Sequence, residues 1–464
     1  MKNICLLLAF FSGTFLKSQD ITGDWYGALK VMGIEIRLTL HVNKTDNGYE
    51  STMDSPDQGA SGIPVTTTTF NHPDFAFELP AAKIEYRGKL ANNKIEGTFT
   101  QAGQEFPLNL SRDKIEKKAL NRPQEPKEPF AYYTEEVMFK NRKAQVDLYG
   151  TLTLPKKDGK FPVVIMITGS GPQNRNEEIL GHKPFLVIAD HLAKNGIGSL
   201  RFDDRGTGKS TGDHSKATSA DFANDVKEAV DYLMTRLEVD KKKIGLMGHS
   251  EGGLIAPLVA AGSENIRFIV LLAGPGVRGG EILLAQQELI GRVSGASEEE
   301  LAEQKKLNAG IYEIIYKTGN AEEAKKKLKT HLPNAYKKIQ KTDMPEGMTE
   351  EAFTEQIIST YTTPWMYYFI KYDPAPTLQK LKCAVLAVNG SKDLQVPSKQ
   401  NLDAIKINLS KGRNNKSETI EFPGLNHLFQ ECKTGSPDEY GEIEQTFSPA
   451  ALEEITKWIV AQTK

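Results

Sequence analysis

The chain has 464 residues, of which 39% are hydrophobic and 25% are charged, and its formal net charge is −2. This length exceeds that of one ordinary domain, so two or three packed units are expected. Because positive and negative residues are intermingled, the composition argues against nucleic acid or an anionic membrane as the partner, and it favours a small neutral or mildly charged substrate.

Residues 1–18 have the pattern of a signal peptide, with Lys2 before an apolar run from Ile4 to Leu16 and the small residue Ser18 at its end. The run is shorter than the roughly 20 residues that span a bilayer, and no later stretch is long enough. We therefore expect an exported protein, periplasmic or secreted, without a stable membrane span.

Two cysteines remain outside this segment, Cys383 and Cys432. The predicted strand that Cys383 opens ends near the loop that carries Cys432, so about 20 Å separates them at 3.3 Å per residue. A disulfide cannot bridge that distance, and two unpaired thiols are expected.

Residues 19–115 show hydrophobic alternation with a period of two, clearest where Ile36, Leu38, Leu40 and Val42 alternate with polar residues. Turn-forming residues separate several such runs, which predicts an antiparallel β sandwich or small barrel. The segment 116–130 contains NRPQEPKEP, whose prolines and charges cannot pack into a core, and it is predicted to be a linker.

Residues 131–464 alternate short Val- and Ile-rich runs with helical patterns, of which 218–237 is the clearest. Continuous apolar strands are typical of a parallel sheet covered on both faces, so this part is predicted to be a doubly wound, mostly parallel α/β domain. The predicted strands lie at 163–167, 197–202, 244–247, 266–273, 384–388 and 418–422. Residues 278–370 have helical pattern only, which predicts a helical cap inserted between two strands.

Ser250 lies in Gly248-His249-Ser250-Glu251-Gly252, directly after one predicted strand and before a helical run. This G-x-S-x-G pattern in strand–turn–helix context is typical of a nucleophile held in a sharp turn, with glycines where larger side chains would clash. The bare pattern also arises by chance, so the assignment depends on this context and on the partners of the serine.

A serine nucleophile needs a base, and the base needs a group that orients it. Asp393 and His427 each follow a predicted strand, in the order that this fold requires, and we assign them as the acid and the base. The rival acid Asp373 precedes a strand, at the wrong edge of the sheet. His249 is expected to pack away from the serine, and His182 either lines the pocket or is a solvated loop residue.

The oxyanion of an acyl-transfer intermediate needs preorganised N–H donors. The predicted donors are the backbone N–H groups of Glu251, after the nucleophile, and of Ser170, in the Gly-rich loop 168–172. Trp365 and Tyr368, where the cap returns to the sheet, are candidates for the wall of an acyl pocket, although the cluster 364–369 also fits a core. The loop Asp203–Gly208 is predicted to be a structural turn rather than a phosphate site.

Several motifs together resemble the bacterial exported α/β-hydrolases of the EstD-like carboxylesterase family. They are GHSEGG at 248–253, GSGPQNRNE at 169–177, FDDRGTGKS at 202–210, YDPAP at 372–376, NGSKDLQVP at 389–397 and, in the N-terminal β domain, DSPDQGA at 54–60. The resemblance implies an α/β-hydrolase fold and a cofactor-free esterase for short acyl chains, with Ser250, Asp393 and His427 as its triad. Thr168 departs from many lipases, which carry His there, and this leaves the hydrogen bonding of that loop open.

The predicted function is therefore a serine carboxylesterase that acts on small-molecule esters through an acyl-enzyme, with no metal or other cofactor. Three alternatives remain: a serine peptidase or aminoacyl amidase of prolyl-oligopeptidase-like type, an acyl thioesterase, and a binding module with a vestigial triad. The large propeller of the first group does not fit into about 90 residues. Whether the protein forms a homo-oligomer is left open.

Overall fold

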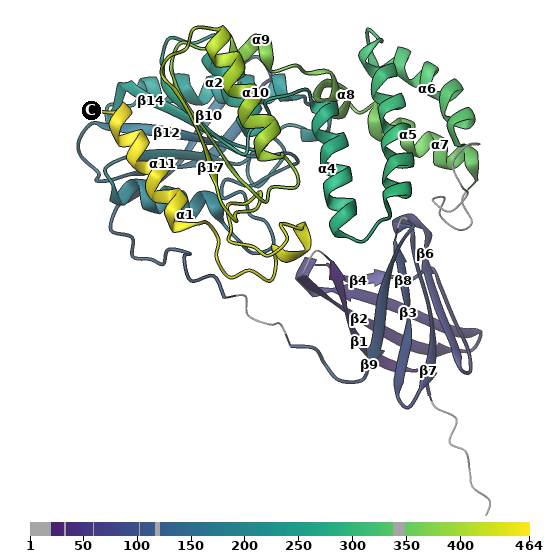
Figure 1. Ribbon diagram of the computed structural model, residues 1–464. Helices are drawn as coiled ribbons and strands as arrows, with labels where there is room; N and C mark the ends of the chain where they lie inside the picture. Colours follow the sequence, from purple (N-terminus) through teal and green to yellow (C-terminus); the bar gives the residue numbers. More distant parts are fainter. Residues whose placement is uncertain (1–19, 32–33, 59, 102, 117–120, 337–348) are drawn as a thin grey trace, which may run out of the picture. The chain divides into compact units, whose positions relative to one another are not determined.

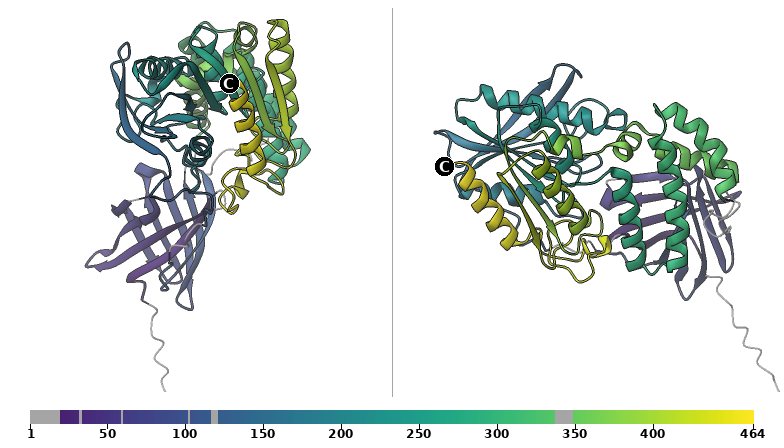
Figure 2. Two further views of the ribbon diagram at one scale, coloured as in Figure 1. Left: turned by 90° about the vertical axis from the view of Figure 1, so that its left-hand side faces the viewer. Right: turned by 45° about the horizontal axis from the view of Figure 1, so that its top comes forward.

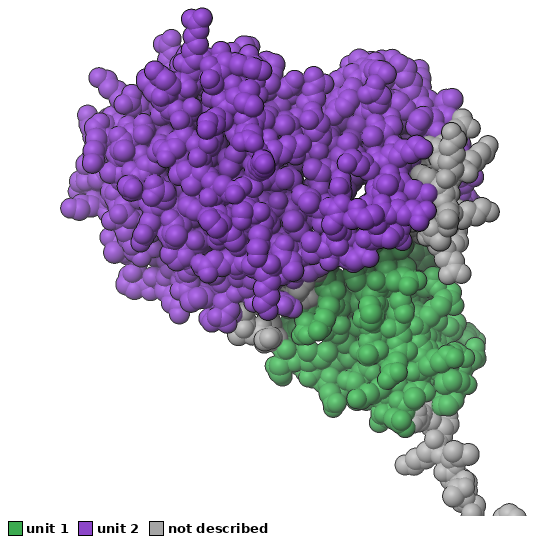
Figure 3. Space-filling model, in the orientation of Figure 1, with its two compact units in different colours: residues 1–118 green, residues 119–464 purple. Residues whose placement is uncertain are grey.

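The computed structural model describes residues 20–31, 34–58, 60–101, 103–116, 121–336 and 349–464. The predicted signal peptide therefore lies outside the described residues. The chain divides into two units, 1–118 and 119–464 (Figure 3), and the division falls within the predicted linker. No helix among the described residues is both long and apolar enough to cross a bilayer.

The first unit is an antiparallel sheet in the order β2-β1-β9-β8-β7-β6-β5-β3-β4. An additional pairing of β2 with β3 closes the sheet into a barrel, to which β4 is added. In β2 the side chains of Leu38, Leu40 and Val42 point into the core, so the period of two seen in the sequence is the inside–outside alternation of this barrel. The strands are β1 (Gly23–Val31), β2 (Ile34–Thr45), β3 (Gly48–Ser55), β4 (Ala60–Pro64), β5 (Thr67–Asn71), β6 (Asp74–Leu79), β7 (Ile84–Ala91), β8 (Lys94–Gln101) and β9 (Gln104–Ser111).

The second unit is built on an eight-stranded sheet in the order β10-β11-β13-β12-β14-β15-β16-β17 (Figure 1). From β13 to β17 neighbouring strands are parallel, whereas β10 and β11 form an antiparallel edge. The strands are β10 (Tyr133–Asn141), β11 (Val146–Leu154), β12 (Phe161–Ile167), β13 (Gly198–Phe202), β14 (Val239–His249), β15 (Ile266–Leu272), β16 (Ala384–Gly390) and β17 (Ser417–Phe422). This mostly parallel sheet with its antiparallel edge confirms the α/β-hydrolase fold.

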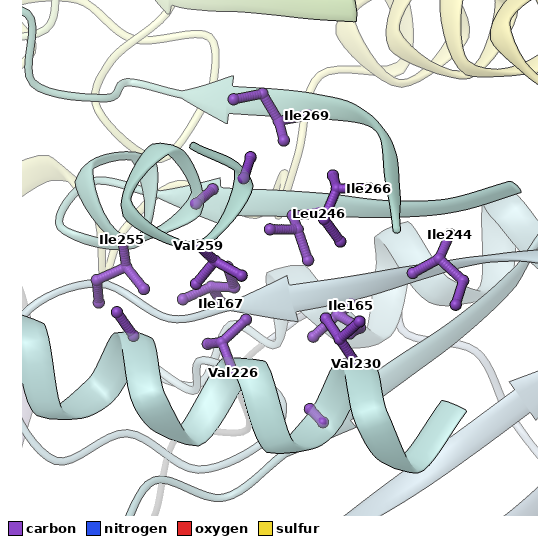
Figure 4. Packing of buried hydrophobic residues seen from close by; sticks show 14 of the residues in the cluster. Ile165, Ile167, Val226, Val230, Ile244, Leu246, Ile255, Val259, Ile266 and Ile269 are labelled. Atoms are coloured by element: carbon purple, nitrogen blue, oxygen red, sulfur yellow. The ribbon is translucent and has the colours of Figure 1, made fainter. Parts of the chain in front are cut away.

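Helices cover both faces of this sheet (Figures 1 and 2). One face packs against α2 (Ser219–Thr235), α3 (Gly252–Ala260) and α10 (Ser398–Lys411), and the other against α1 (Pro184–Lys194) and α11 (Pro449–Gln462). In β12 the side chains of Ile165 and Ile167 point to the first face (Figure 4), while Met166 points to the second. A strand buried on both sides must be apolar throughout, which explains the continuous hydrophobic runs of the sequence.

The predicted helix 218–237 is shorter in the structure. A capping box of Thr218 and Asp221 begins α2. The helix ends at Thr235 because Arg236 has extended backbone geometry. Leu237, which the helical pattern placed on the apolar face, is consequently 81% exposed.

Between β15 and β16 the chain forms the predicted cap. Its helices are α4 (Gly279–Val293), α5 (Glu298–Tyr316), α6 (Ala321–Tyr336), α7 (Glu350–Tyr361) and α8 (Pro364–Lys371), and the short α9 (Ala375–Leu378) leads back to the sheet. Ile311, Ile315 and Leu328 belong to a hydrophobic cluster that the cap forms for itself. The cap is thus a small helical layer with its own core, and α4 and α8 are the helices that reach the site described below.

Candidate active site

Ser250 occupies the sharp turn between β14 and α3. Its φ of +51° lies in the left-handed region, which is strained for a residue with a side chain. The glycines on either side of this turn, Gly248 and Gly252, leave no room for a side chain. A Cβ at Gly248 would lie 1.9 Å from the carbonyl oxygen of Gly252, and a Cβ at Gly252 would lie 2.2 Å from the carbonyl oxygen of Ile167. The strand and the helix therefore approach each other more closely than any larger residue allows.

His427 and Asp393 form a hydrogen-bonded pair at the carboxyl edge of the sheet. His427 Nδ1 lies 2.8 Å from Asp393 Oδ2, and both side chains are buried. Asp393 Oδ1 accepts hydrogen bonds from the backbone N–H groups of Gln395 and Val396, at 2.8 and 2.9 Å, so the carboxylate is fixed in place. The His427 Nε2 atom has no hydrogen-bond partner among the described residues. This arrangement gives a neutral imidazole a proton on Nδ1 and leaves Nε2 free to accept one.

Ser250 and His427 line one cavity of about 230 Å³. The cap contributes part of its apolar wall, and its polar lining consists of three glutamines, two glutamates, two serines and two histidines. The lining residues are Gly169, Ser170, Gln173, Glu177, Ile179, His249, Ser250, Glu251, Pro275, Ile282, Leu283, Gln286, Trp365, Phe369, Gln395, Val396, His427 and Leu428. The cavity thus offers a partly open site with both apolar and polar walls beside the serine.

One pocket candidate differs from the sequence prediction. Trp365 lines the cavity, but Tyr368 does not, because its ring stacks on Tyr372 with the centroids 5.8 Å apart. Phe369, one helical turn beyond Trp365, stacks on the Trp365 ring and lines the cavity instead.

The two predicted oxyanion donors both lie on the cavity wall. Among the described residues, neither the Ser170 nor the Glu251 backbone N–H has a hydrogen-bond acceptor. The neighbouring Gly169 N–H donates to Glu177 Oε1 at 2.7 Å. A Cβ at Gly169 would lie 3.3 Å from Ser250 Cβ, so this loop packs directly against the nucleophile turn. The two unpaired N–H groups are therefore free to bind an oxyanion near Ser250.

Thr168, the departure from the lipase pattern, has a clear hydrogen-bonding role. Its hydroxyl donates to the Asp204 carboxyl, which also accepts the Gln173 N–H at 3.0 Å. Burial raises the pKa of Asp204 to about 8, against the smaller effect of these hydrogen bonds. Asp204 thus connects the two ends of the segment from Thr168 to Gln173, which contains Ser170.

The Glu251 side chain is a second buried acid, and sequence reasoning did not single it out. Its Oε1 accepts hydrogen bonds from the Ser219 hydroxyl at 2.6 Å and from Trp365 Nε1 at 2.8 Å. Burial raises the pKa of this carboxyl, and the hydrogen bonds, including one from the Ser170 hydroxyl, oppose that shift. The residue after the nucleophile therefore ties the turn to α2 and to the cap helix α8.

His249 is buried, but its environment is polar. Its Nδ1 lies 3.0 Å from Glu177 Oε1, and its Nε2 lies 2.9 Å from the carbonyl oxygen of His427. His182 neither lines the cavity nor meets solvent: it is buried, with Nε2 2.9 Å from the Tyr440 carbonyl oxygen. Both alternatives considered for His182 are therefore wrong, because the loop that carries it packs against the C-terminal segment.

The loop Asp203–Gly208 is held by ion pairs. Asp203 pairs with Arg175 at 2.7 Å and Arg205 with Asp225 at 2.8 Å, which leaves no cation there for a phosphate. Asp373, the rival acid, lies 3.2 Å from Arg278 and does not line the cavity.

Cys383 and Cys432 are free thiols, as expected. No cluster of three or more metal-ligating side chains occurs among the residues that the structure describes.

Comparison with known proteins gives one family and several relatives. Residues 145–407, more than half of the chain, match the family model described as X-Pro dipeptidyl-peptidase (S15 family). The chain is 25% identical over 333 residues to the esterase EstD of Thermotoga maritima, covering 71% of this chain and 69% of that protein. It is 22% identical over 253 residues to an uncharacterized 31.7 kDa protein of Escherichia coli, covering 54% and 79%. Among solved structures, an esterase of Pyrococcus furiosus aligns with 17% identity and a TM-score of 0.41, covering 71% of this chain and 93% of that one.

Proposed function

The chain belongs to the X-Pro dipeptidyl-peptidase (S15) family, and within this family we propose that it is a serine carboxylesterase that hydrolyses small neutral esters. It is a serine hydrolase of EstD-like type, and the finer question is whether it cleaves esters or aminoacyl amides. The observation that carries the proposal is that the two carboxyl groups on the cavity wall, Glu177 and Glu251, already accept hydrogen bonds from the protein.

A dipeptidyl-peptidase must bind the positively charged amino terminus of its substrate, which requires a free anionic or carbonyl acceptor. In this cavity the Glu177 carboxylate already accepts hydrogen bonds from Gly169 and His249, and that of Glu251 from Ser219 and Trp365. Burial also raises the pKa of Glu251 and so disfavours its charged form. An ammonium group at Glu177 would compete with His249 for the same carboxylate, and one at Glu251 would need the charged form that burial disfavours, which supports a neutral substrate.

In the proposed mechanism, His427 Nε2 takes the proton of Ser250 as the hydroxyl oxygen attacks the ester carbonyl. The carbonyl oxygen becomes an oxyanion, which accepts hydrogen bonds from the Ser170 and Glu251 N–H groups. His427 then gives its proton to the departing alcohol oxygen and leaves an acyl group on Ser250. A water molecule, deprotonated by the same imidazole, attacks this acyl-enzyme and releases the acid, while Asp393 stabilises each imidazolium.

A substrate panel on the purified protein tests the proposal. We expect hydrolysis of p-nitrophenyl acetate and butyrate to exceed that of an alanyl-prolyl p-nitroanilide in kcat/KM by at least about 10³, and Ser250→Ala to abolish both. Preference for the anilide would assign the S15 peptidase activity instead. Preference for an acyl thioester of matched chain length would assign a thioesterase, and activity that survives in Ser250→Ala would remove the serine mechanism altogether.

The opposite possibility, an S15 peptidase, is favoured by the family match itself. It requires the Glu177 or Glu251 carboxylate to bind the substrate amino group in addition to its protein partners. Strong competitive inhibition of ester hydrolysis by a free dipeptide with a C-terminal proline would be its signature, and no inhibition is expected for an esterase.

Because residues 1–18 have the pattern of a signal peptide, we further propose that the enzyme works outside the cytoplasm. Expression in a Gram-negative host followed by N-terminal sequencing of the periplasmic and medium fractions tests this placement. Protein retained in the cytoplasm with Met1 intact would contradict it.

A further inference from the structure

Four groups next to the proposed active site form an unbroken line of hydrogen bonds. The Gly169 N–H donates to Glu177 Oε1, the same oxygen lies 3.0 Å from His249 Nδ1, and His249 Nε2 lies 2.9 Å from the His427 carbonyl oxygen. Gly169 directly precedes Ser170, the proposed oxyanion donor. The line therefore runs from the oxyanion loop, through the residue before the nucleophile, to the loop that carries the catalytic base.

With Glu177 as a carboxylate, the proton count along this line requires a charged His249. Both of its ring nitrogens face oxygen atoms that only accept hydrogen bonds, a carboxylate and a backbone carbonyl. A neutral imidazole has one N–H and would leave its other nitrogen lone pair against an acceptor, whereas an imidazolium donates to both.

The electrostatic surroundings agree with this count. Burial lowers the pKa of His249 and is the largest single effect, but the Glu177 carboxylate, the His427 carbonyl and Asp393 together outweigh it, so the net pKa is raised. The titratable groups that face the ring are Glu177, His427, whose ring centroid is 4.7 Å away, and Asp393. A buried imidazolium and carboxylate hold each other in fixed geometry, since separating them would leave an unpaired buried charge.

Glu177 is also held against its own backbone preference. Its φ is +51°, a left-handed conformation that is unfavourable for a residue with a side chain. The surrounding contacts must impose this conformation, and it aims the carboxylate at Gly169 and His249.

We propose that His249, as an imidazolium paired with Glu177, is the positioning residue that locks the catalytic base and the oxyanion donor of this hydrolase into register with Ser250. The inference rests on the proposed serine mechanism, but it concerns residues that take no proton from the substrate. Because the pair fixes geometry rather than contacting the reacting atoms, its loss should lower kcat and leave KM nearly unchanged.

Four variants and one matched control test the proposal. His249→Phe keeps a ring in place but removes both hydrogen bonds, and Glu177→Leu removes the carboxylate. We expect each to lower kcat for p-nitrophenyl butyrate by about 10- to 100-fold, with KM within about threefold of wild type. Glu177→Gln keeps an acceptor oxygen without the charge and should give an intermediate kcat. The double variant His249→Phe/Glu177→Leu should lose no more than the stronger single variant, because the two residues act as one unit.

His182→Phe is the control, since His182 is an equally buried, hydrogen-bonded histidine outside the cavity. Burial lowers the pKa of His182 to about 4, so it is neutral where His249 is charged. We expect His182→Phe to lower stability but to keep kcat within about threefold of wild type. Wild-type kcat in a folded His249→Phe, while Ser250→Ala is inactive, would overturn the positioning role and leave the proposed function intact.

The charge itself is measured on the wild-type protein. In ¹⁵N-histidine NMR at pH 7, we expect the His249 ring, assigned by the absence of its signals in His249→Phe, to show two protonated nitrogens. A neutral ring at pH 7 would overturn the inference whatever the kcat values of the variants.

Discussion

Gly248→Ala tests the geometry of the nucleophile turn most severely. The added Cβ would lie 1.9 Å from the Gly252 carbonyl oxygen, while real Cβ contacts stay beyond about 3.0 Å, so β14 and α3 must separate by about 1 Å. Such overpacking costs typically about 1–3 kcal/mol of stability. A displacement of this size at Ser250 is expected to lower kcat by about 10², even though no catalytic group is removed.

The matched control is Gly262→Ala, just beyond the end of α3. A Cβ there meets nothing closer than the Val259 carbonyl oxygen at 3.9 Å, an ordinary contact. The assay compares kcat for p-nitrophenyl butyrate and the free energy of unfolding in urea for both variants. If Gly248→Ala matches Gly262→Ala in both measurements, the close strand–helix approach does not position Ser250, and the reasoning is refuted.

Three further predictions follow from the contacts around the site. Asp393→Asn should lower kcat by about 10⁴ by disturbing the tautomer of His427, and a loss below tenfold would argue for another acid. Trp365→Phe keeps the apolar wall but removes the hydrogen bond to Glu251, so urea unfolding should show a loss of about 1–3 kcal/mol; unchanged stability would contradict that bond. Because burial raises the pKa of Asp204 to about 8, the folded protein binds a proton there that the unfolded chain has already lost. This contribution to the free energy of unfolding is complete below the ordinary carboxyl range and is lost as the pH rises toward 8. The stability of Asp204→Asn relative to wild type should therefore rise between pH 5 and 7, by at most about 1.4 kcal/mol per pH unit, and a constant difference would exclude this titration.

The strands of the second unit could be predicted because burial on both faces makes them continuously apolar. The site positions could be predicted because G-x-S-x-G, Asp393 and His427 each follow such a strand, and the carboxyl ends of parallel strands meet at one edge of the sheet. The antiparallel edge strands β10 and β11 have no continuous apolar run, because their buried side chains alternate with more exposed ones.

The contacts that sequence reasoning missed connect distant segments of the chain. Glu177 and His249 are 72 positions apart, and Glu251 and Trp365 are 114 apart, so no local pattern connects them. Polar residues that are buried in such networks look like ordinary loop or turn residues in a sequence. The only local signal was the polar pair His249 and Glu251 flanking Ser250 in an otherwise apolar strand and helix.

Covalent labelling of Ser250 tests the central claim most directly. The protein is treated with a fluorophosphonate, digested and mapped by mass spectrometry while ester hydrolysis is followed in the same sample. We predict one phosphonyl group per chain, on the peptide that contains Ser250, with loss of activity in proportion to labelling and no label in Ser250→Ala. Full activity in a protein labelled at Ser250, or stoichiometric labelling of another residue as activity is lost, would contradict the account.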